Sequence, residues 1–441
     1  MICFDFISVI TYIIIMKNYF ETPLSAPKEG EPLNTAQATQ SSQFYQRGLG
    51  LKKEVQGILK KEYYSNLVEY LRANNFKLRG GGLTIHLAKE FGFCYGVDRA
   101  VDYAYQTREK FPDRRIFLTG EIIHNPHVNN RLIEMGLLFL SGQYCNGTTI
   151  ADLKPADVVI LPAFGVSIVE FQKLKQLGCI LVDTTCGSVL NVWKRVDFYA
   201  QNGYTSIIHG KYHHEETIAT SSQALKYSDG KYLIIRSMEE AQKVLDYILN
   251  GGDRQHFMDT FSKASSPGFD PDRDLQKIGI ANQTTMLSTE SLAIAEEFKK
   301  VFLNKFGEVN LNKHFETFDT ICSATQDRQD AAIDLVKKRK LDLMIVIGGF
   351  NSSNTNHLAE ITSQYTTTYH IDDPESILNK NQIRHKVIGS QEIETTENWF
   401  PEGDLQIGMT AGASTPNNKI GEAVKKILTF RHVDLEHLMN G

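Results

Sequence analysis

The strongest constraint on this chain is a pattern that occurs three times: an apolar run typical of a strand, a cysteine, and then a helical pattern. The three cysteines are Cys94, Cys186 and Cys322, separated by roughly 90 and roughly 135 residues. A cysteine at the start of a helix lies near the positive end of the helix dipole, which favours the thiolate that binds metals. The gaps are far too long for a CxxC zinc motif or a ferredoxin-type run. A shared site would therefore have to be assembled from three domains.

Polar loops follow further apolar runs in each of the three units. Their candidate ligand-binding residues are neutral or weakly basic donors beside glycine-rich backbone, namely His124, His214, Thr284, Ser352, Asn354 and Ser414. This composition suits a phosphate group that is held without a Walker lysine. A single loop of this kind is usually a turn or a helix cap. Six such residues at equivalent places favour a binding site, with Glu216 as the candidate proton donor.

Length and composition restrict the class of protein. The 441 residues predict about three domains, and 41% hydrophobic with 22% charged residues is ordinary for a soluble globular protein. The net charge of -5 and the absence of a basic run argue against nucleic acid or a membrane surface as partner. Six cysteines in so long a chain favour a reducing compartment over a disulfide scaffold. Cys3, Cys145 and Cys179 lack the strand and helix context, and we expect them to be packing thiols.

The domain organisation follows from the same patterns. Residues 1–15 are apolar but short for a membrane span, so we favour an over-extended start with Met16 as the true first residue; a weak targeting segment is the alternative. Arg79–Gly82 is interpreted as a hinge. The predicted segments are a disordered or spurious extension at 1–50, a helical extension and linker at 51–82, α/β domains at 83–185, 186–319 and 320–430, an insertion near 251–274, and a tail at 431–441.

Spacing alone leaves three explanations of the cysteines open. Three thiolates cannot complete a tetrahedral structural zinc site, but on a cubane cluster they leave one iron free for a substrate. The alternatives are unrelated buried thiols and a zinc site of three cysteines and one histidine. From the residues alone, a catalytic 4Fe-4S cluster is thus one hypothesis of three.

Several ordered stretches resemble 4-hydroxy-3-methylbut-2-enyl diphosphate reductases, and most closely the longer form of cyanobacteria and plastids. The resemblance extends from about Gly50 to about Leu428. It rests on the stretches GFCYGVDRAV, EIIHNP, VVILPAFG, VDTTC, YTSIIHGKYHHEET, ANQTTML, TICSATQDRQDA, GGFNSSNTNHL and TAGASTP.

The resemblance implies three similar α/β domains in a pseudo-threefold arrangement around one central 4Fe-4S iron-sulfur cluster. The cluster would be held by Cys94, Cys186 and Cys322. The implied substrate-binding residues are His124, His214, Thr284, Ser352, Ser353, Asn354 and Ser414. Glu216, Thr284 and His214 are the implied catalytic residues, with Glu216 supplying protons.

The resemblance also implies the reaction, which is the last step of the methylerythritol phosphate route to isoprenoids. The allylic diphosphate substrate would lose its hydroxyl group reductively and give isopentenyl and dimethylallyl diphosphate. Ferredoxin or flavodoxin would donate the electrons, while nucleic acid and stable membrane association are not expected. The reaction would take place in a bacterial cytoplasm, or in the plastid stroma if the source is eukaryotic.

This sequence departs from the usual family pattern at three places. Phe164 stands where many bacterial members have a histidine, so we expect Lys211 or His213 to compensate. Gly187-Ser188 replaces a usual proline after the cysteine, and Asn191 replaces a usual lysine. Two rival functions stay open on the sequence: an iron-sulfur redox sensor that binds a protein partner, and a phosphate-binding enzyme with structural zinc.

Overall fold

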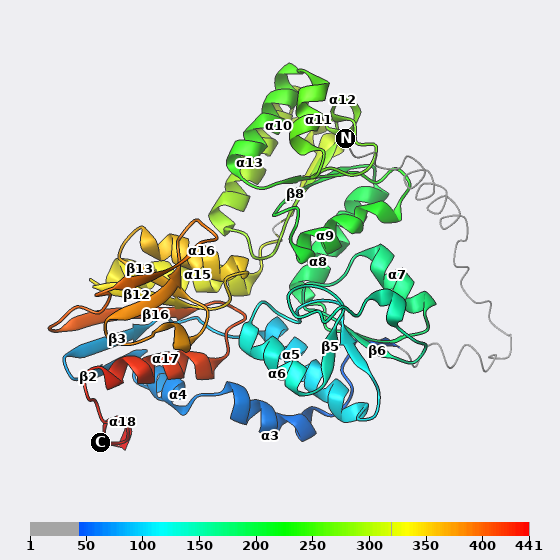
Figure 1. Ribbon diagram of the computed structural model, residues 1–441. Coiled ribbons are helices and arrows are strands. Elements are labelled where there is room, and N and C mark those ends of the chain that lie inside the picture. Colours follow the sequence, from blue (N-terminus) through cyan, green and yellow to red (C-terminus); the bar gives the residue numbers. More distant parts are fainter. Residues whose placement is uncertain (1–43, 319, 441) are drawn as a thin grey trace, which may run out of the picture.

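The computed structural model describes residues 44–318 and 320–440 and shows three sheets with helices packed around them (Figure 1). The predicted over-extended start, including Met16 and Cys3, lies outside the described residues. No helix in the described part of the chain is long and apolar enough to cross a membrane.

The first sheet is parallel throughout and has the strand order β1-β7-β6-β4-β5. Its strands are β1 (Phe44–Tyr45), β4 (Ile116–Leu118), β5 (Leu137–Phe139), β6 (Val158–Leu161) and β7 (Ile180–Asp183). Its helices are α5 (Tyr95–Lys110), α6 (Pro126–Glu134), α7 (Ile168–Gln176) and the turn η1 (Ile150–Asp152). The strands are apolar along their length because helices cover both faces of a parallel sheet.

The second sheet is also parallel, with the order β11-β10-β8-β9. Its strands are β8 (Thr205–His209), β9 (Tyr232–Ile235), β10 (Ile278–Asn282) and β11 (Phe315–Thr317). Its helices are α8 (Gly187–Gln201), α9 (Glu215–Ser222), η2 (Ala224–Lys226), α10 (Met238–Asn250), α11 (Arg254–Phe261), α12 (Pro271–Asp274), α13 (Ser288–Phe306), η3 (Glu308–Asn310) and α14 (Leu311–His314). The predicted insertion near 251–274 contains α11 and α12, and Phe257 and Phe261 pack into the core of this unit.

The third sheet is mixed, with the order β15-β14-β13-β12-β16-β3-β2 and antiparallel strands at both edges. Its strands are β2 (Lys77–Gly80), β3 (Leu83–Leu87), β12 (Leu343–Ile347), β13 (Thr368–Ile371), β14 (Gln382–Lys386), β15 (Ile393–Glu397) and β16 (Leu405–Ala411). The remaining helices are α3 (Lys52–Tyr63), α4 (Asn66–Ala73), α15 (Ser323–Lys338), α16 (Ser353–Ser363), η4 (Pro374–Ser376), α17 (Asn417–Thr429) and α18 (Leu435–Asn440).

Each of the three cysteines lies where the chain passes from one unit to the next. Cys94 follows β3 of the third sheet and precedes α5, which packs on the first sheet. Cys186 leads from β7 of the first sheet to α8, which packs on the second. Cys322 leads from β11 of the second sheet to α15, which packs on the third. The three crossings form a closed ring.

The structure differs from the sequence prediction at the start of the first domain. The first predicted domain starts at residue 83, but the strand Leu83–Leu87 pairs in parallel with β16 and therefore belongs to the third sheet. All five of its residues are buried, so the strand needs a neighbour on each edge, and β2 provides the other. The strand pattern predicts a strand but not its partner.

The predicted hinge at Arg79–Gly82 is instead the turn of a hairpin. Gly80 pairs with Leu83 across the β2–β3 hairpin. Gly81 and Gly82 have φ of 58° and 78°, the left-handed conformation that a two-residue hairpin turn requires and that glycine adopts without strain. The turn is therefore a rigid connection.

The described end of the predicted disordered extension is ordered. Phe44–Tyr45 form β1, which pairs with β7, and the Phe44 ring packs edge-to-face on Phe171. The helical extension joins two units, because α3 packs with the first core and α4 with the third. The other predicted domain boundaries, including the tail from residue 431, stay predictions.

A substitution in β10 tests the close packing of helix and sheet. A Cβ atom added at Gly279 would lie 2.5 Å from ring carbons of the buried Tyr199. We expect Gly279→Ala to destabilise the protein by about 1–3 kcal/mol, because the ring has no room to move. In contrast, Gly57→Ala in α3 meets open space and should stabilise by about 0.5–1 kcal/mol. Urea unfolding midpoints measure both changes, and equal midpoints for the two variants would contradict this account of the packing.

Candidate active site

A cavity lies where the three units meet. It is lined by every site residue that the sequence predicted: Cys94, His124, Cys186, His214, Glu216, Thr284, Cys322, Ser352, Ser353, Asn354 and Ser414. These residues follow the carboxyl ends of parallel strands or begin the next helix, which is where ligands bind in α/β sheets. The structure therefore brings the predicted residues together, and their chemical roles are a separate question.

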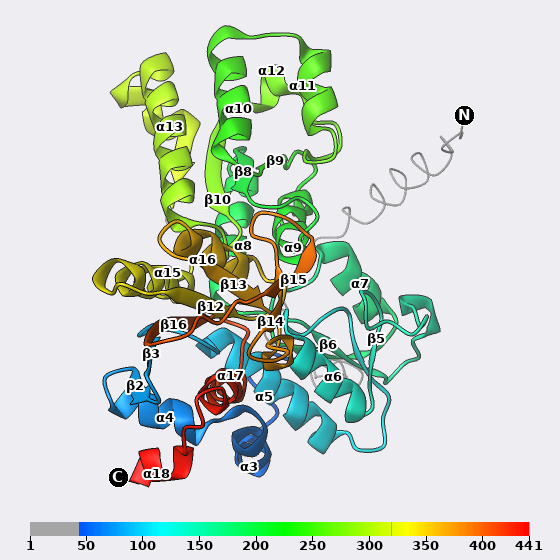
Figure 2. The same cartoon turned by 60° about the vertical axis from the view of Figure 1, so that its left-hand side comes forward.

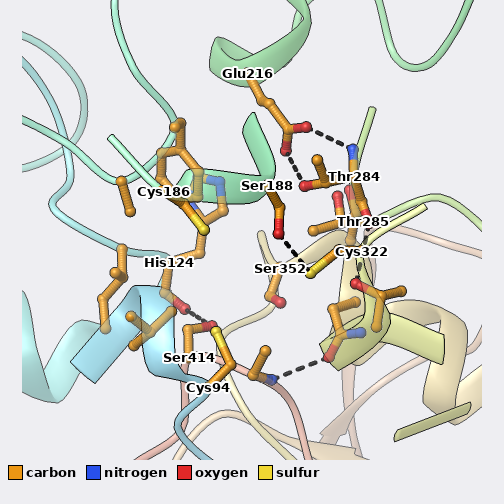
Figure 3. A pocket seen from close by; sticks show the side chains of 18 of the residues that line it. Cys94, His124, Cys186, Ser188, Glu216, Thr284, Thr285, Cys322, Ser352 and Ser414 are labelled. Atoms are coloured by element: carbon orange, nitrogen blue, oxygen red, sulfur yellow. Dashed lines mark hydrogen bonds between the residues drawn. The ribbon is translucent and has the colours of Figure 1, made fainter. Parts of the chain in front are cut away.

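Each cysteine is the residue immediately before the first turn of a helix. Cys94, Cys186 and Cys322 precede α5, α8 and α15, and in Figure 3 their sulfur atoms face the same space. Burial raises the pKa of the Cys94 and Cys186 thiols, although helix N–H groups act in the opposite direction. The N–H groups of the first helical turn thus lower the thiol pKa, and burial outweighs this effect.

A buried arginine connects two of the cysteine segments. The Arg328 guanidinium donates to the carbonyl oxygen of Gly92 at 2.7 and 3.1 Å and to that of Ala324 at 2.7 Å. Gly92 precedes Cys94, and Ala324 lies in the first turn after Cys322. The arginine therefore fixes the Cys94 loop against α15, and its charge lowers the pKa of Cys94 against the effect of burial.

The carboxyl group of Glu216 is buried against the loop after β10. It accepts hydrogen bonds from the Thr284 N–H at 2.5 Å and from the Thr284 hydroxyl at 3.0 Å (Figure 3). Only 1% of the residue is exposed. Burial raises the pKa of Glu216 to about 7, with the two Thr284 hydrogen bonds acting in the opposite direction. The group can therefore hold or release a proton near neutral pH.

Two histidines form a chain of contacts next to Glu216. His214 Nδ1 accepts from the Glu216 N–H at 3.2 Å, so its Nε2 carries the hydrogen and faces His124 Nε2 at 3.3 Å. Burial is the main cause that lowers the pKa of His214 well below its usual value, which keeps the ring neutral. On the other side, His124 Nδ1 donates to Glu121 at 2.9 Å.

At the start of α16, the side-chain oxygens of three consecutive residues already accept hydrogen bonds from other groups of the protein. Ser352 Oγ accepts from the N–H and the hydroxyl of Thr355. Ser353 Oγ accepts from Lys211 Nζ at 3.3 Å and from Gln283 Nε2 at 3.4 Å. Each serine hydroxyl hydrogen is consequently free to donate.

The third of these residues, Asn354, shows the same arrangement more clearly. Its Oδ1 accepts from the Ala413 N–H at 3.0 Å, while its buried Nδ2 has no hydrogen-bond partner. A buried donor without a partner is costly, so it indicates a ligand with acceptor oxygens. The neighbouring Ser414 hydroxyl donates to the His124 carbonyl oxygen at 3.3 Å.

Of the four residues that depart from the family pattern, Phe164 and Ser188 line the cavity, and the Ser188 hydroxyl donates to Cys322 Sγ at 3.3 Å. Phe164 lines the cavity and stacks on His124, with ring centroids 4.2 Å apart. Lys211, one of the two predicted substitutes, reaches Ser353, whereas the other, His213, is exposed and packs on Tyr212. Gly187 and Asn191 are exposed.

Sequence reasoning missed three residues that support the site: Glu121, Gln283 and Arg328. Glu121 lies three residues before His124, and Gln283 precedes Thr284, so both belong to stretches that the sequence had singled out. Their contacts were not predictable, because Gln283 joins Ser353, 70 residues away, and Arg328 joins Gly92, 236 residues away. Cys145 and Cys179 line no part of the cavity, in agreement with their expected packing role.

Comparison with known proteins decides the family. The profile of the family described as LytB protein matches residues 85–428. The chain belongs to the LytB family. Members of this family are iron-sulfur enzymes.

Two relatives are similar to the chain in sequence, and one solved structure is similar to it in fold. The 4-hydroxy-3-methylbut-2-enyl diphosphate reductase of Gloeothece citriformis is 50% identical over 399 residues, covering 89% of this chain and 96% of that protein. The enzyme of the same name from Picosynechococcus sp. is 51% identical over 389 residues, covering 88% and 94%. The structure of E-1-hydroxy-2-methyl-but-2-enyl-4-diphosphate reductase from Plasmodium falciparum aligns with a TM-score of 0.56 at 23% identity, covering 77% and 86%. The last comparison confirms the predicted α/β fold class.

The cysteines of this LytB chain fit an iron-sulfur cluster better than a single zinc ion. Sulfur atoms on one tetrahedral zinc are roughly 3.8 Å apart, given zinc–sulfur bonds of about 2.3 Å. Among the described residues, the one group of three potential ligands whose atoms lie within 4.8 Å of one another is His124, His214 and Glu215. At least two of the cysteine sulfurs are thus further apart than one zinc ion allows. Their spacing suits a larger group.

Gly96, two residues after the first cysteine, tests this cysteine arrangement. A Cβ atom at Gly96 would lie 2.4 Å from Cys186 Sγ, whereas one at Gly187 would meet nothing within 4 Å. We expect Gly96→Ala to displace the Cys186 side chain and lower the iron content of anaerobically purified protein several-fold. Gly187→Ala, next to the same cysteine, should keep the wild-type iron content. An unchanged iron content in Gly96→Ala would mean that Cys186 does not need its present position.

Proposed function

We propose that this chain catalyses the reductive dehydroxylation of (E)-4-hydroxy-3-methylbut-2-enyl diphosphate to isopentenyl and dimethylallyl diphosphate. This reaction is the last step of the methylerythritol phosphate pathway. The observation that carries the proposal is one cavity that combines three cysteines, a buried proton-holding carboxyl group and a set of free hydrogen-bond donors. Relatives named for this reaction match almost the whole chain at about half identity. A redox sensor would not need the buried Glu216–Thr284 pair, so that alternative is not favoured.

We further propose one 4Fe-4S cluster per chain, held by Cys94, Cys186 and Cys322. When bound, the cluster would supply electrons one at a time and Lewis acidity at the iron that no cysteine holds. The chain contributes the surroundings of this site. Buried apolar residues such as Ile123 and Val189 line the cavity and limit access of water.

The diphosphate group would be bound by the donors at the start of α16. Ser352, Ser353 and Asn354 each have a free donor hydrogen, and the helix N-terminus adds a favourable dipole for an anion. The neutral His214 presents its Nε2 hydrogen to the same cavity, beside His124. The Lys211 ammonium group donates to Ser353 Oγ and so brings a positive charge next to the proposed diphosphate site, which fits its expected role as a substitute donor.

The balance of the reaction gives Glu216 a defined task. The substrate takes up two electrons and two protons, its C4–O bond breaks, and the oxygen leaves as water. One proton goes to the leaving hydroxyl group, and the other forms the new C–H bond. We propose that protonated Glu216 supplies protons through the adjacent Thr284 hydroxyl, with the Thr284 hydrogen bonds holding the carboxyl group in place.

The electrons have to come from a carrier protein, and we propose ferredoxin or flavodoxin. All cysteines in the described part of the chain are free thiols, as expected in a reducing compartment. Together with the cyanobacterial relatives, this supports a bacterial cytoplasm as the site of the reaction, or the plastid stroma if the source is eukaryotic.

The proposed function is tested by turnover of the substrate with reduced methyl viologen under anaerobic conditions. We expect both five-carbon diphosphates as products, together with about four irons and four sulfides per chain. Product identity is read by mass spectrometry and metal content by chemical analysis. Protein that carries zinc and no iron would contradict the proposed 4Fe-4S cluster. A full cluster without turnover would contradict the proposed substrate.

Replacing the buried carboxyl group tests the proton path. We expect Glu216→Gln to retain iron and bind substrate while turnover falls by about 10²–10⁴-fold, because the amide cannot supply a proton. An exposed glutamate outside the cavity provides the control: Glu109→Gln on α5 should keep the wild-type activity. Since the pKa of Glu216 is raised to about 7, the protonated form is lost as pH rises through 7, and wild-type turnover should fall there. Wild-type turnover in Glu216→Gln would exclude this group from the path.

A further inference from the structure

Cys94 lines two hollows. Besides the central cavity, it lines an outer groove of about 1400 Å³ between α3 and the first turns of α5. Both views of the ribbon show α3 beside α5 on the outside of the molecule (Figures 1 and 2). A partner in this groove could therefore reach the Cys94 side of the cluster site without entering the substrate cavity.

Exposed aromatic side chains lie at the Cys94 end of the groove. Tyr95, the residue after Cys94, is 82% exposed, and Tyr64 is 54% exposed. Both line the groove together with the partly buried Phe93. Aromatic residues are enriched at the centres of protein interfaces, where they supply contact area at low entropic cost. The groove thus has the composition of a protein-binding surface.

The helix that borders the groove, α3, carries four lysines against two glutamates, Glu54 and Glu62, and so has a net positive charge. Lys52, Lys53, Lys60 and Lys61 are all exposed, and Lys52 and Lys60 line the groove itself. None of the four forms an ion pair within the part of the chain that the structure describes. The whole chain has a net charge of -5, so this patch is opposite in sign to the molecule around it. An acidic partner would be attracted here and repelled elsewhere.

Two acidic residues also line the groove and offset part of this positive charge. Asp98 and Asp102 line it on the α5 side, and burial raises the pKa of both carboxyl groups. Asp102 also accepts a hydrogen bond from Gln106 at 3.0 Å. Arg72 adds a further positive charge to the lining but pairs with Glu69 at 3.1 Å.

We propose that this groove is the docking surface of an acidic one-electron carrier protein, which reduces the bound cluster from the Cys94 side. The proposal rests on the proposed function, because that reaction consumes two electrons from outside. Each docked carrier gives one electron and is itself oxidised, so two successive dockings serve one turnover. A small basic patch around exposed aromatic rings suits such a partner, since electron-transfer complexes are small and must separate quickly.

A charge reversal of two groove lysines tests this surface. In Lys52→Glu/Lys60→Glu, the rate constant for cluster reduction by a reduced acidic 2Fe-2S ferredoxin should fall by about tenfold or more at low salt. Stopped-flow absorbance measures this rate without substrate. Reduction by methyl viologen, a small cation that needs no docking, should keep the wild-type rate. The affinity for oxidised ferredoxin, measured by calorimetry, should also fall about tenfold.

The matched control carries the same charge change on another face. Lys173→Glu/Lys175→Glu on α7 replaces two exposed lysines that lie outside the groove, and it should leave both rates unchanged. A groove variant that keeps the wild-type ferredoxin rate, or that loses both rates equally, overturns the proposal. Because the readouts need no substrate, a wild-type protein that accepts electrons but makes no product would count against the proposed function alone.

Discussion

The three crossings of the chain between the units fix the positions of the cysteines and of the cavity around them. Each cysteine stands at a point where the chain leaves one sheet and enters the first turn of a helix that packs on another. Such a residue is positioned by two cores at once. All three units are therefore needed to form the cavity. Its walls come from the loops that follow the carboxyl ends of the parallel strands in each sheet.

Within this frame, the site depends on a balance between burial and a few directed hydrogen bonds. Burial raises the pKa of Glu216 to about 7, and the two Thr284 bonds prevent a larger rise. The same effect keeps His214 neutral, so that it offers one hydrogen and one lone pair in fixed directions. In α16, contacts behind Ser352, Ser353 and Asn354 fill their acceptor positions and leave donors free. Both the proposed proton transfer and the proposed anion binding thus depend on hydrogen bonds that other residues make to these side chains.

The sequence predicts the site better than it predicts the topology. Strand–cysteine–helix patterns and polar loops after strands are local, and both depend on rules that apply in any α/β protein, so the cavity residues could be named in advance. The assignment of Leu83–Leu87 to the first domain is wrong, because a fully buried strand shows no preference for one sheet over another. The thiol pKa values depend on burial, and the Arg328–Gly92 contact joins residues 236 positions apart. Neither the thiol pKa values nor this contact can be predicted from a local sequence pattern.

The place of β3 also affects how the chain is made. Its neighbour β16 begins roughly 320 residues later, so a ribosome adding about 5–20 residues per second completes that strand roughly 15–60 seconds after β3 has emerged. During this interval one edge of a strand that is wholly buried in the finished fold has no partner from its own sheet, and such edges recruit other chains. The hairpin with β2 covers the opposite edge at once. Biogenesis of this protein therefore depends on protecting a single strand edge until synthesis is nearly finished, a demand that suits a chaperone-assisted route.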